Sequence, residues 1–185
     1  MRAKTEATVE DLYRVPENGK AELVHGEIQL MSPTGGFPGF AATRISSSLD
    51  LHAGRVRRGH GLGDNVGYLV NLAHRKSFSP DAAYYLGKLR MKFLQGAPVF
   101  AAEVRSEGDY GPAAEQEMAD KRADYFAAGT LVVWDVDLLS ADVVRVYRAS
   151  APDQPTIYRR GDRAEAEPAV PGWTMSVEDL FPAEE

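Results

Sequence analysis

Two short apolar runs flank the dipeptide His25-Gly26 in the segment from Ala21 to Met31. Runs of this length that are joined by two turn-forming residues are typical of a tight β-hairpin. A loop rich in glycine and proline follows from Ser32 to Gly39. The pattern therefore predicts a hairpin followed by a loop in the N-terminal part of the chain.

Apolar residues at roughly helical spacing, together with capping residues, predict four helices. Ile45, Leu49 and Leu51 recur at such a spacing. Pro112 and Gly129 stand where proline and glycine usually begin and end a helix. The predicted helices cover Val9 to Tyr13 with Thr8 as N-cap, about Phe40 to Arg57, Pro112 to about Ala128, and Ser176 to Phe181 with Ser176 and Asp179 resembling a capping box.

Short runs rich in apolar residues predict the strands of a sheet. The run from Ala97 to Val104 has no polar alternation, which is typical of a strand that is covered on both faces. The segment from Gly59 to Gly63 is interpreted as a turn, because it does not lead from a strand into a helix as a dinucleotide-binding loop does. The predicted strands cover Gly67 to Leu72, Phe78 to Tyr85, Ala97 to Val104, Leu131 to Asp137 and Val143 to Arg148, with a further strand near Thr156 to Arg160.

The predicted elements follow one another as hairpin, helix, strands, helix and strands. This order indicates a mixed β-sheet with helices packed against it, a fold of the α/β or α+β class. The chain has 185 residues, the length of one ordinary domain. Residues 1–185 are therefore expected to form a single domain.

The composition excludes several kinds of site. The chain has no cysteine, which rules out disulfides, zinc–thiolate centres and cysteine nucleophiles. Its four histidines lack the spacing of a zinc site. The formal net charge of −6 counts against a module that grips DNA by bulk electrostatics, but less against a nuclease with a local basic strip.

Neither end of the hydropathy range points to a membrane or to secretion. The segment from Met1 to Glu10 is charged and has no apolar core, so no signal peptide is expected. No apolar run approaches the roughly 18 residues that span a bilayer. A cytoplasmic location is the expectation, and the absence of cysteine fits a reducing compartment.

Glu103 is the first candidate for chemistry, because it ends the most hydrophobic run in the chain. With period-two alternation it shares one strand face with Ala101 and Arg105. A carboxylate at the end of a buried strand costs free energy unless a cation or hydrogen bonds compensate its charge. The alternative is an ordinary strand-end glutamate that reaches solvent or pairs with Arg105.

Asp81 is the second candidate and stands at the start of a predicted strand, directly after Pro80. Proline fixes its own φ angle and holds the preceding residue extended, so it can direct the side chain that follows. A Pro-Asp pair is common, however, and usually marks a turn.

Lys121 is the third candidate, and its place on the predicted helix is the most informative signal. Met118 and Tyr125 lie on the same helical stripe and are expected to face the sheet, with Lys121 between them. A lysine on the inward face of a helix calls for a partner. The alternatives are that its amine reaches solvent or pairs with Glu117 four residues earlier.

Taken together, these residues form an ordered pattern that resembles the Uma-two family, a branch of the PD-(D/E)xK nuclease superfamily. The resemblance covers nearly the whole chain, and its strength lies in the order and spacing of many short pieces. The matching pieces are Glu22-Leu23-Val24 with Gly26-Glu27, Ser32-Pro33, Pro80-Asp81, Glu103-Val104-Arg105-Ser106, Asp120-Lys121, Tyr125, Gly129, Trp134-Asp135, Val146-Tyr147, Pro171-Gly172 and Leu180-Phe181.

The resemblance implies a restriction-endonuclease-like fold and an endonuclease that hydrolyses phosphodiester bonds in DNA. In such a site Asp81 and Glu103 would ligate Mg²⁺ or Mn²⁺. Lys121 would replace the motif lysine, moved from the strand to the following helix, and Glu22 would be an additional acidic residue. Nucleases of this fold often act as dimers, so the resemblance also implies a homodimer or a higher homo-oligomer as an expected assembly.

The chemistry suits these residue types. Two carboxylates can hold a hard cation, which polarises a phosphate and lowers the pKa of a bound water. Lys121 would orient or help to deprotonate that water, or stabilise charge in the transition state. Tyr125, one turn further along the helix, could hold the lysine or pack, and packing is the favoured interpretation.

The chain departs from the family pattern at two places. The strand position that usually carries the motif lysine is Arg105, which leaves that role to Lys121 or, as the weaker choice, to Arg105 itself. Family members often carry a histidine at the start of the helix after the Ser-Pro loop, where this chain reads Phe37-Pro38-Gly39-Phe40.

Two further functional hypotheses follow from these departures. One is a catalytically degenerate nuclease fold that binds nucleic acid or a protein partner without cutting. The other is a hydrolase that acts on a different phosphate ester, because a fold does not fix its substrate.

Overall fold

The computed structural model describes residues 6–15 and 19–183, and a six-stranded mixed sheet forms its centre. Strands β8 and β9 run parallel, whereas the other neighbouring strands are antiparallel. The predicted class, a mixed sheet with helices packed against it, is confirmed. In spatial order the strands are β11 (Ala151–Tyr158), β10 (Val144–Arg148), β9 (Val132–Val136), β8 (Phe100–Val104), β6 (Ala82–Tyr85) and β3 (His60–Leu62).

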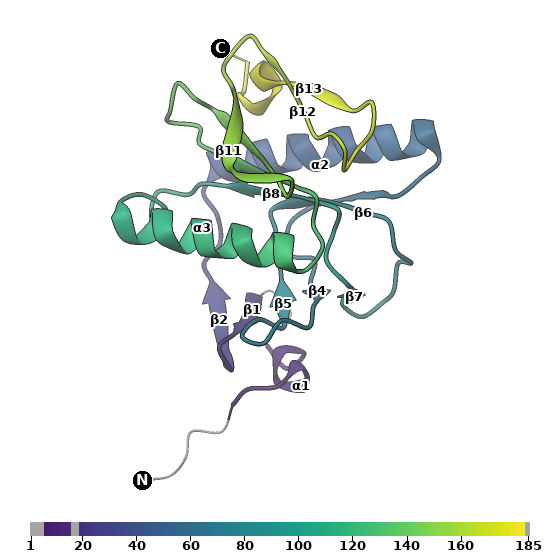
Figure 1. Ribbon diagram of the computed structural model, residues 1–185, viewed down its shortest axis with the longest axis vertical. Helices are drawn as coiled ribbons and strands as arrows, with labels where there is room; N and C mark the ends of the chain where they lie inside the picture. Colours follow the sequence, from purple (N-terminus) through teal and green to yellow (C-terminus); the bar gives the residue numbers. More distant parts are fainter. Residues whose placement is uncertain (1–5, 16–18, 184–185) are drawn as a thin grey trace.

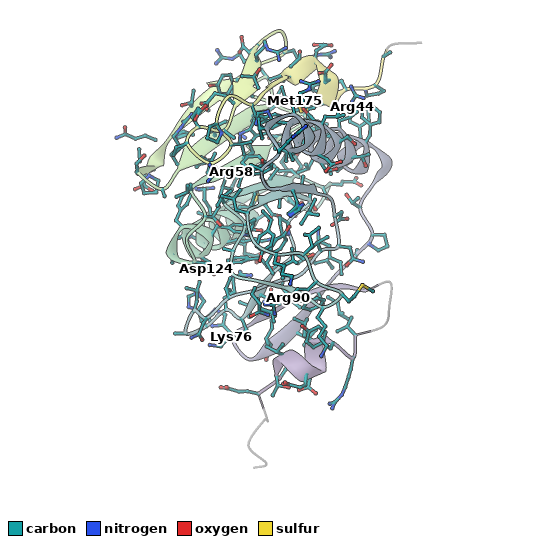
Figure 2. The ribbon with its side chains drawn as sticks, turned by 90° about the vertical axis from the view of Figure 1, so that its right-hand side faces the viewer. Arg44, Arg58, Lys76, Arg90, Asp124 and Met175 are labelled. Carbon is teal, nitrogen blue, oxygen red and sulfur yellow. The ribbon has the colours of Figure 1, made fainter. Side chains whose placement is uncertain are left out.

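Two long helices cover opposite faces of this sheet, as Figure 1 shows with the sheet between them. Helix α2 (Gly36–Val56) packs on β3, β6 and β8, and helix α3 (Pro112–Ala127) packs near β9. The C-terminal segment adds the two-stranded sheet of β12 (Arg163–Glu165) and β13 (Thr174–Ser176), followed by the 3₁₀ helix η1 (Val177–Leu180). In Figure 2, Met175 of this segment lies beside α2.

The N-terminal part forms the predicted hairpin, β1 (Lys20–Val24) and β2 (Glu27–Met31), after the short helix α1 (Val9–Leu12). His25 and Gly26 both have positive φ angles, 50° and 71°, as a two-residue hairpin turn requires. The predicted cap of α1 is present, because Thr8 and Asp11 form a reciprocal capping box. Below the main sheet, β4 (Tyr68–Leu69), β5 (Ser77–Phe78) and β7 (Leu94–Gln95) form a small three-stranded sheet.

Strand β8 is buried on both faces, as its uninterrupted apolar run predicts. Phe100, Ala102 and Val104 belong to the core that α2 and the C-terminal segment cover. Ala101 belongs to the second core, which contains Tyr125 of α3. Because side chains alternate along a strand, Glu103 lies on the α3 side with Ala101. This alternation decides which helix can reach Glu103.

Helix α2 begins at Gly36, so the prediction of a loop through Gly39 and a helix from Phe40 was wrong. The two glycines and Pro38 look like loop residues in sequence. The first N–H groups of a helix have no acceptor within the helix, so Pro38 costs no hydrogen bond in the first turn.

The strand predicted from Phe78 to Tyr85 is divided, because β5 and β6 belong to different sheets. The chain passes from one to the other at Ser79-Pro80-Asp81, where proline removes a backbone donor. The strand predicted from Gly67 to Leu72 is reduced to the two residues of β4.

The segment from Gly59 to Gly63, which was interpreted as a turn, contains the edge strand β3. A Cβ atom on Gly61 would lie 2.2 Å from the backbone nitrogen of Asp50, so glycine lets this strand lie directly on α2. The pattern alone could not reveal this close approach, because it involves a helix ten residues earlier.

Two expectations in the C-terminal part were also wrong. Ser176 ends β13 and its side chain forms no cap, and the following turn is 3₁₀ rather than α-helical. The strand expected near Thr156 to Arg160 begins earlier and covers β11 (Ala151–Tyr158), which pairs with β10. The predicted pairing of β10 with β9 is confirmed.

The contact between β3 and α2 yields a stability test. We expect Gly61→Ala to lower the free energy of unfolding by about 1–3 kcal/mol, because the new methyl group would overlap the backbone of α2. Chemical denaturation monitored by circular dichroism measures the change. Gly63→Ala is the matched control, since its Cβ would lie 3.4 Å from the Ser46 side chain. Equal effects of the two substitutions would contradict the proposed contact.

Candidate active site

The pairing of β6 with β8 places Asp81 next to Glu103. In this antiparallel pair Ala82 lies opposite Ala102, so one further step sets Asp81 opposite Glu103. The Asp81 backbone N–H donates to the Ala102 carbonyl at 3.1 Å, and the Val104 N–H donates to Asp81 Oδ2 at 2.8 Å. The Asp81 carboxylate is therefore fixed on the strand that carries Glu103.

The hairpin contributes two more charged side chains. Lys20 and Glu22 are two residues apart in β1 and so point to the same side of the strand. The Lys20 ammonium lies 2.6 Å from Asp81 Oδ1 and 2.8 Å from Asp64 Oδ1. Glu22 is almost fully buried, at 2% exposure.

Helix α3 supplies a lysine and a tyrosine. Lys121 Nζ lies 3.0 Å from Glu22 Oε1 and 3.0 Å from Glu103 Oε1. The Tyr125 hydroxyl donates to the same Glu103 oxygen at 2.6 Å, while its ring stacks on Phe78 with centroids 4.0 Å apart. The expected direction of Lys121 toward the strand ends is confirmed, and Tyr125 both packs and bonds to the carboxylate.

A second layer of polar groups holds Glu22. The Ser79 N–H donates to Glu22 Oε1 at 2.8 Å, and the Arg75 guanidinium donates to Oε2 at 2.6 Å. Arg75 is held in turn by Asp124, at 2.7 Å from its Nε atom. Asp124, labelled in Figure 2, also contacts His74 Nε2 at 2.7 Å. A chain of charge pairs thus runs from His74 near the surface to the buried Lys121.

These groups line one cleft of about 1300 Å³ between the hairpin, the ends of β6 and β8, and α3. Its wall includes charged side chains from each of these elements: Lys20, Glu22, Asp81, Glu103 and Lys121. Among the residues that the structure describes, no three His, Asp or Glu side chains form a ready-made metal cluster.

The same residues lie within a recognised sequence family. A family model with the description "Putative restriction endonuclease", Uma2, matches residues 9–178. The chain belongs to the Uma2 family. No significant match was found among curated proteins.

A solved structure supports the fold of this Uma2 protein. It is a crystal structure of a protein from Anabaena variabilis, described as a "putative nuclease belonging to DUF820". The alignment covers 94% of the present chain and 97% of that chain, with a TM-score of 0.73 and 18% sequence identity. At this identity the similarity shows the fold. Within the described residues of the Uma2 protein, the helices are too short or too polar to cross a lipid bilayer.

The two buried glutamates of the Uma2 site differ in protonation. Burial raises the pKa of Glu103, and the Asp81 and Glu22 charges add to this, while Lys121 acts in the opposite direction. Burial would also raise the pKa of Glu22, but the Lys121 and Arg75 cations and the Ser79 N–H outweigh it and hold that pKa below its ordinary value. Glu22 is thus the more fully compensated of the two carboxylates.

The helix residues of the site stay protonated at neutral pH. Burial favours the neutral amine of Lys121, but the Glu103 and Glu22 carboxylates outweigh it and raise its pKa above the ordinary value. Burial, together with the Glu103 and Glu22 carboxylates, raises the pKa of Tyr125 well above its ordinary value. Lys121 therefore presents an ammonium group and Tyr125 a neutral hydroxyl donor.

Arg105 lies at the edge of the cleft and is engaged elsewhere. Its Nε and one terminal nitrogen each donate to an Asp135 carboxylate oxygen at 2.8 Å, and it also pairs with Glu115. Asp135 stands on β9, directly beside Glu103 in the parallel register. Arg105 thus ties β8 to β9 and to α3.

The structure brings together five of the six residues that the sequence singled out: Glu22, Asp81, Glu103, Lys121 and Tyr125. The sequence analysis missed Lys20, Arg75, Asp124 and His74. Lys20 carried one usable signal, because it is two residues before Glu22 in a predicted strand and shares its face. Arg75 carried no comparable signal, since its contact with Glu22 depends on the pairing of β1 with the segment that precedes β5.

The raised pKa of Glu103 predicts a pH-dependent effect on stability. An ionised Glu103 destabilises the folded state at any pH above its ordinary pKa of 4.5. We expect Glu103→Gln, which cannot ionise, to increase the free energy of unfolding by roughly 1 kcal/mol near pH 8. The gain should vanish as the pH falls below about 4.5, because the wild-type carboxyl is then neutral in both states. Urea denaturation at several pH values measures this, and a loss of stability at pH 8 would contradict it.

The Arg105 contacts predict a structural role. We expect Arg105→Met to lower the free energy of unfolding by about 3–5 kcal/mol, because it leaves the buried Asp135 carboxylate without its cation. Thermal and urea denaturation measure the loss. Arg90→Met, at the exposed arginine labelled in Figure 2, is the control and should change stability little. A stable Arg105→Met variant would argue that the guanidinium is kept for catalysis instead.

Proposed function

We propose that this Uma2 protein is a Mg²⁺- or Mn²⁺-dependent endonuclease that hydrolyses phosphodiester bonds in DNA. The observation that carries the proposal is the convergence of Asp81, Glu103 and the protonated Lys121 in one cleft. The family description and the fold of the solved relative agree with it.

The donor set fits a hard divalent cation. Asp81 and Glu103 are neighbouring carboxylates on paired strands, and the Asp81 charge raises the Glu103 pKa, so the pair favours an added cation. Mg²⁺ commonly binds through one or two carboxylates and completes its shell with water and substrate phosphate. Two carboxylates without a third ligand suit this mode. Such an ion supplies a Lewis acid and an activated water.

Lys121 has a defined part in this chemistry. Because it is protonated, it cannot accept a proton from water at neutral pH, so its ammonium orients the nucleophile or stabilises negative charge on the phosphate. Glu22 and Glu103 hold the ammonium from two sides. The neutral Tyr125 hydroxyl fixes Glu103 Oε1 and leaves Glu103 Oε2 for a ligand.

The charge of the cleft also bears on the substrate. Carboxylates outnumber cations among its walls, so a DNA phosphate would be repelled without a bound divalent ion. Metal and substrate are therefore expected to bind together, and a metal-free preparation should bind DNA weakly.

Nicking of supercoiled plasmid DNA in Mg²⁺ or Mn²⁺ tests the proposal. We expect Asp81→Asn, Glu103→Gln and Lys121→Met each to lower the cleavage rate by at least ~100-fold, as the loss of one preorganised charge commonly does. Chelation with EDTA should abolish cleavage. Asp153→Asn, at an exposed carboxylate on β11, is the control and should keep the wild-type rate. Residual activity equal in all variants would refute the assignment.

One observation favours a second candidate, a degenerate nuclease fold that binds nucleic acid or a protein without cutting. Each Asp81 oxygen already has a partner, Lys20 or the Val104 N–H, so the site is electrostatically satisfied without a metal. Calorimetric titration with Mn²⁺ separates the two candidates. Binding that Asp81→Asn abolishes favours the nuclease, and the absence of binding favours the degenerate fold.

A further inference from the structure

Lys20 occupies an unusual position for a residue outside the family motif. Its ammonium lies 2.6 Å from Asp81 Oδ1 and 2.8 Å from Asp64 Oδ1, and its side chain is only 15% exposed. The charge of Glu103 also acts on it and favours its protonated form. A positive charge therefore already stands beside the two carboxylates that would take a divalent ion.

Two cations cannot share this place without a large electrostatic cost. Unit charges about 4 Å apart repel by about 4 kcal/mol near a protein surface, and a divalent ion doubles the repulsion. Asp81 Oδ1 can hold the Lys20 ammonium or a metal ion, but not both at contact distance. Binding of the ion thus requires Lys20 to move.

The second partner of Lys20 gives it a place to go. Asp64 lies in the loop between β3 and β4, with 41% of its side chain exposed, and it is held by the Asn65 N–H at 2.7 Å. The β1 backbone is fixed by its pairing with β2, where Lys20 lies opposite Met31. The flexible lysine stem can therefore swing toward Asp64 while the hairpin stays in place.

We propose that Lys20 is a built-in competitor for the metal ion at Asp81 and that Asp64 is the carboxylate to which its ammonium withdraws when the ion binds. This inference rests on the proposed function, because it needs a metal site at Asp81 and Glu103. In the metal-free protein Lys20 neutralises Asp81 and so removes the cost of a half-buried unpaired carboxylate. The same contact lowers the affinity for the ion.

Mn²⁺ binding to the full chain, measured by isothermal titration calorimetry without DNA, tests this without relying on activity. We expect Lys20→Met to tighten Mn²⁺ binding by about tenfold, within the usual range of coupling between two sites. Asp64→Asn should weaken it several-fold, because Lys20 then has no second carboxylate. In Lys20→Met/Asp64→Asn the Asp64 effect should disappear, since no ammonium remains to withdraw.

Two controls separate contact competition from the general effect of charge. Lys76→Met removes a lysine whose amine contacts Asn71 and the Leu72 carbonyl instead, and it should leave Mn²⁺ affinity within about twofold of wild type. Repeating the titrations at about 0.5 M NaCl screens long-range charge but leaves the contact, so the Lys20→Met effect should persist. Circular dichroism shows that each variant is folded, and Asp64→Asn still tests the inference if Lys20→Met does not fold.

The outcomes distinguish this inference from the proposed function. If wild type binds Mn²⁺ through Asp81 and Lys20→Met binds no tighter, Lys20 is not a competitor and only this inference is overturned. If Asp64→Asn has the same effect in the presence and absence of Lys20, the withdrawal to Asp64 is overturned. If neither wild type nor Lys20→Met binds Mn²⁺, both the metal site and the inference are overturned.

Discussion

The Lys121 ammonium contacts two buried carboxylates, Glu22 and Glu103, at 3.0 Å each. These three residues come from the hairpin, the central sheet and α3, so the contact joins the three parts that form the cleft. An isolated carboxylate at this depth would cost several kcal/mol, and a lone ammonium would cost as much. Each charge is therefore tolerated only because the fold brings the others to it.

The remaining charged residues extend this arrangement without relaxing it. Arg75 and the Ser79 N–H complete the bonding of Glu22, which keeps its pKa low, whereas Glu103 has fewer partners and a raised pKa. The less compensated carboxylate is thus the one beside Asp81, where a cation is expected. The stability that the protein forgoes at Glu103 is consistent with a site kept for binding rather than for folding.

The fold and much of the candidate site could be predicted from local signals. Pro80 before Asp81, the uninterrupted apolar run that ends at Glu103, and the inward face of the helix that carries Lys121 each depend on residues near in sequence. Predictions failed where a distant contact overrides the local pattern. Gly61 forms a strand because it packs on α2, and the segment before Asp81 changes sheets at Pro80.

The sequence by itself determined which residues carry charge on which face of each element, because strand and helix periodicities are local properties of the chain. It therefore identified Asp81, Glu103 and Lys121, and set Lys20 on the same strand face as Glu22. Only the tertiary structure decided the partners: Asp135 for Arg105, Arg75 for Glu22, and both Asp81 and Asp64 for Lys20. The physical reason is that an ion pair between buried groups depends on sheet register and helix docking, which segments far apart in the chain fix jointly.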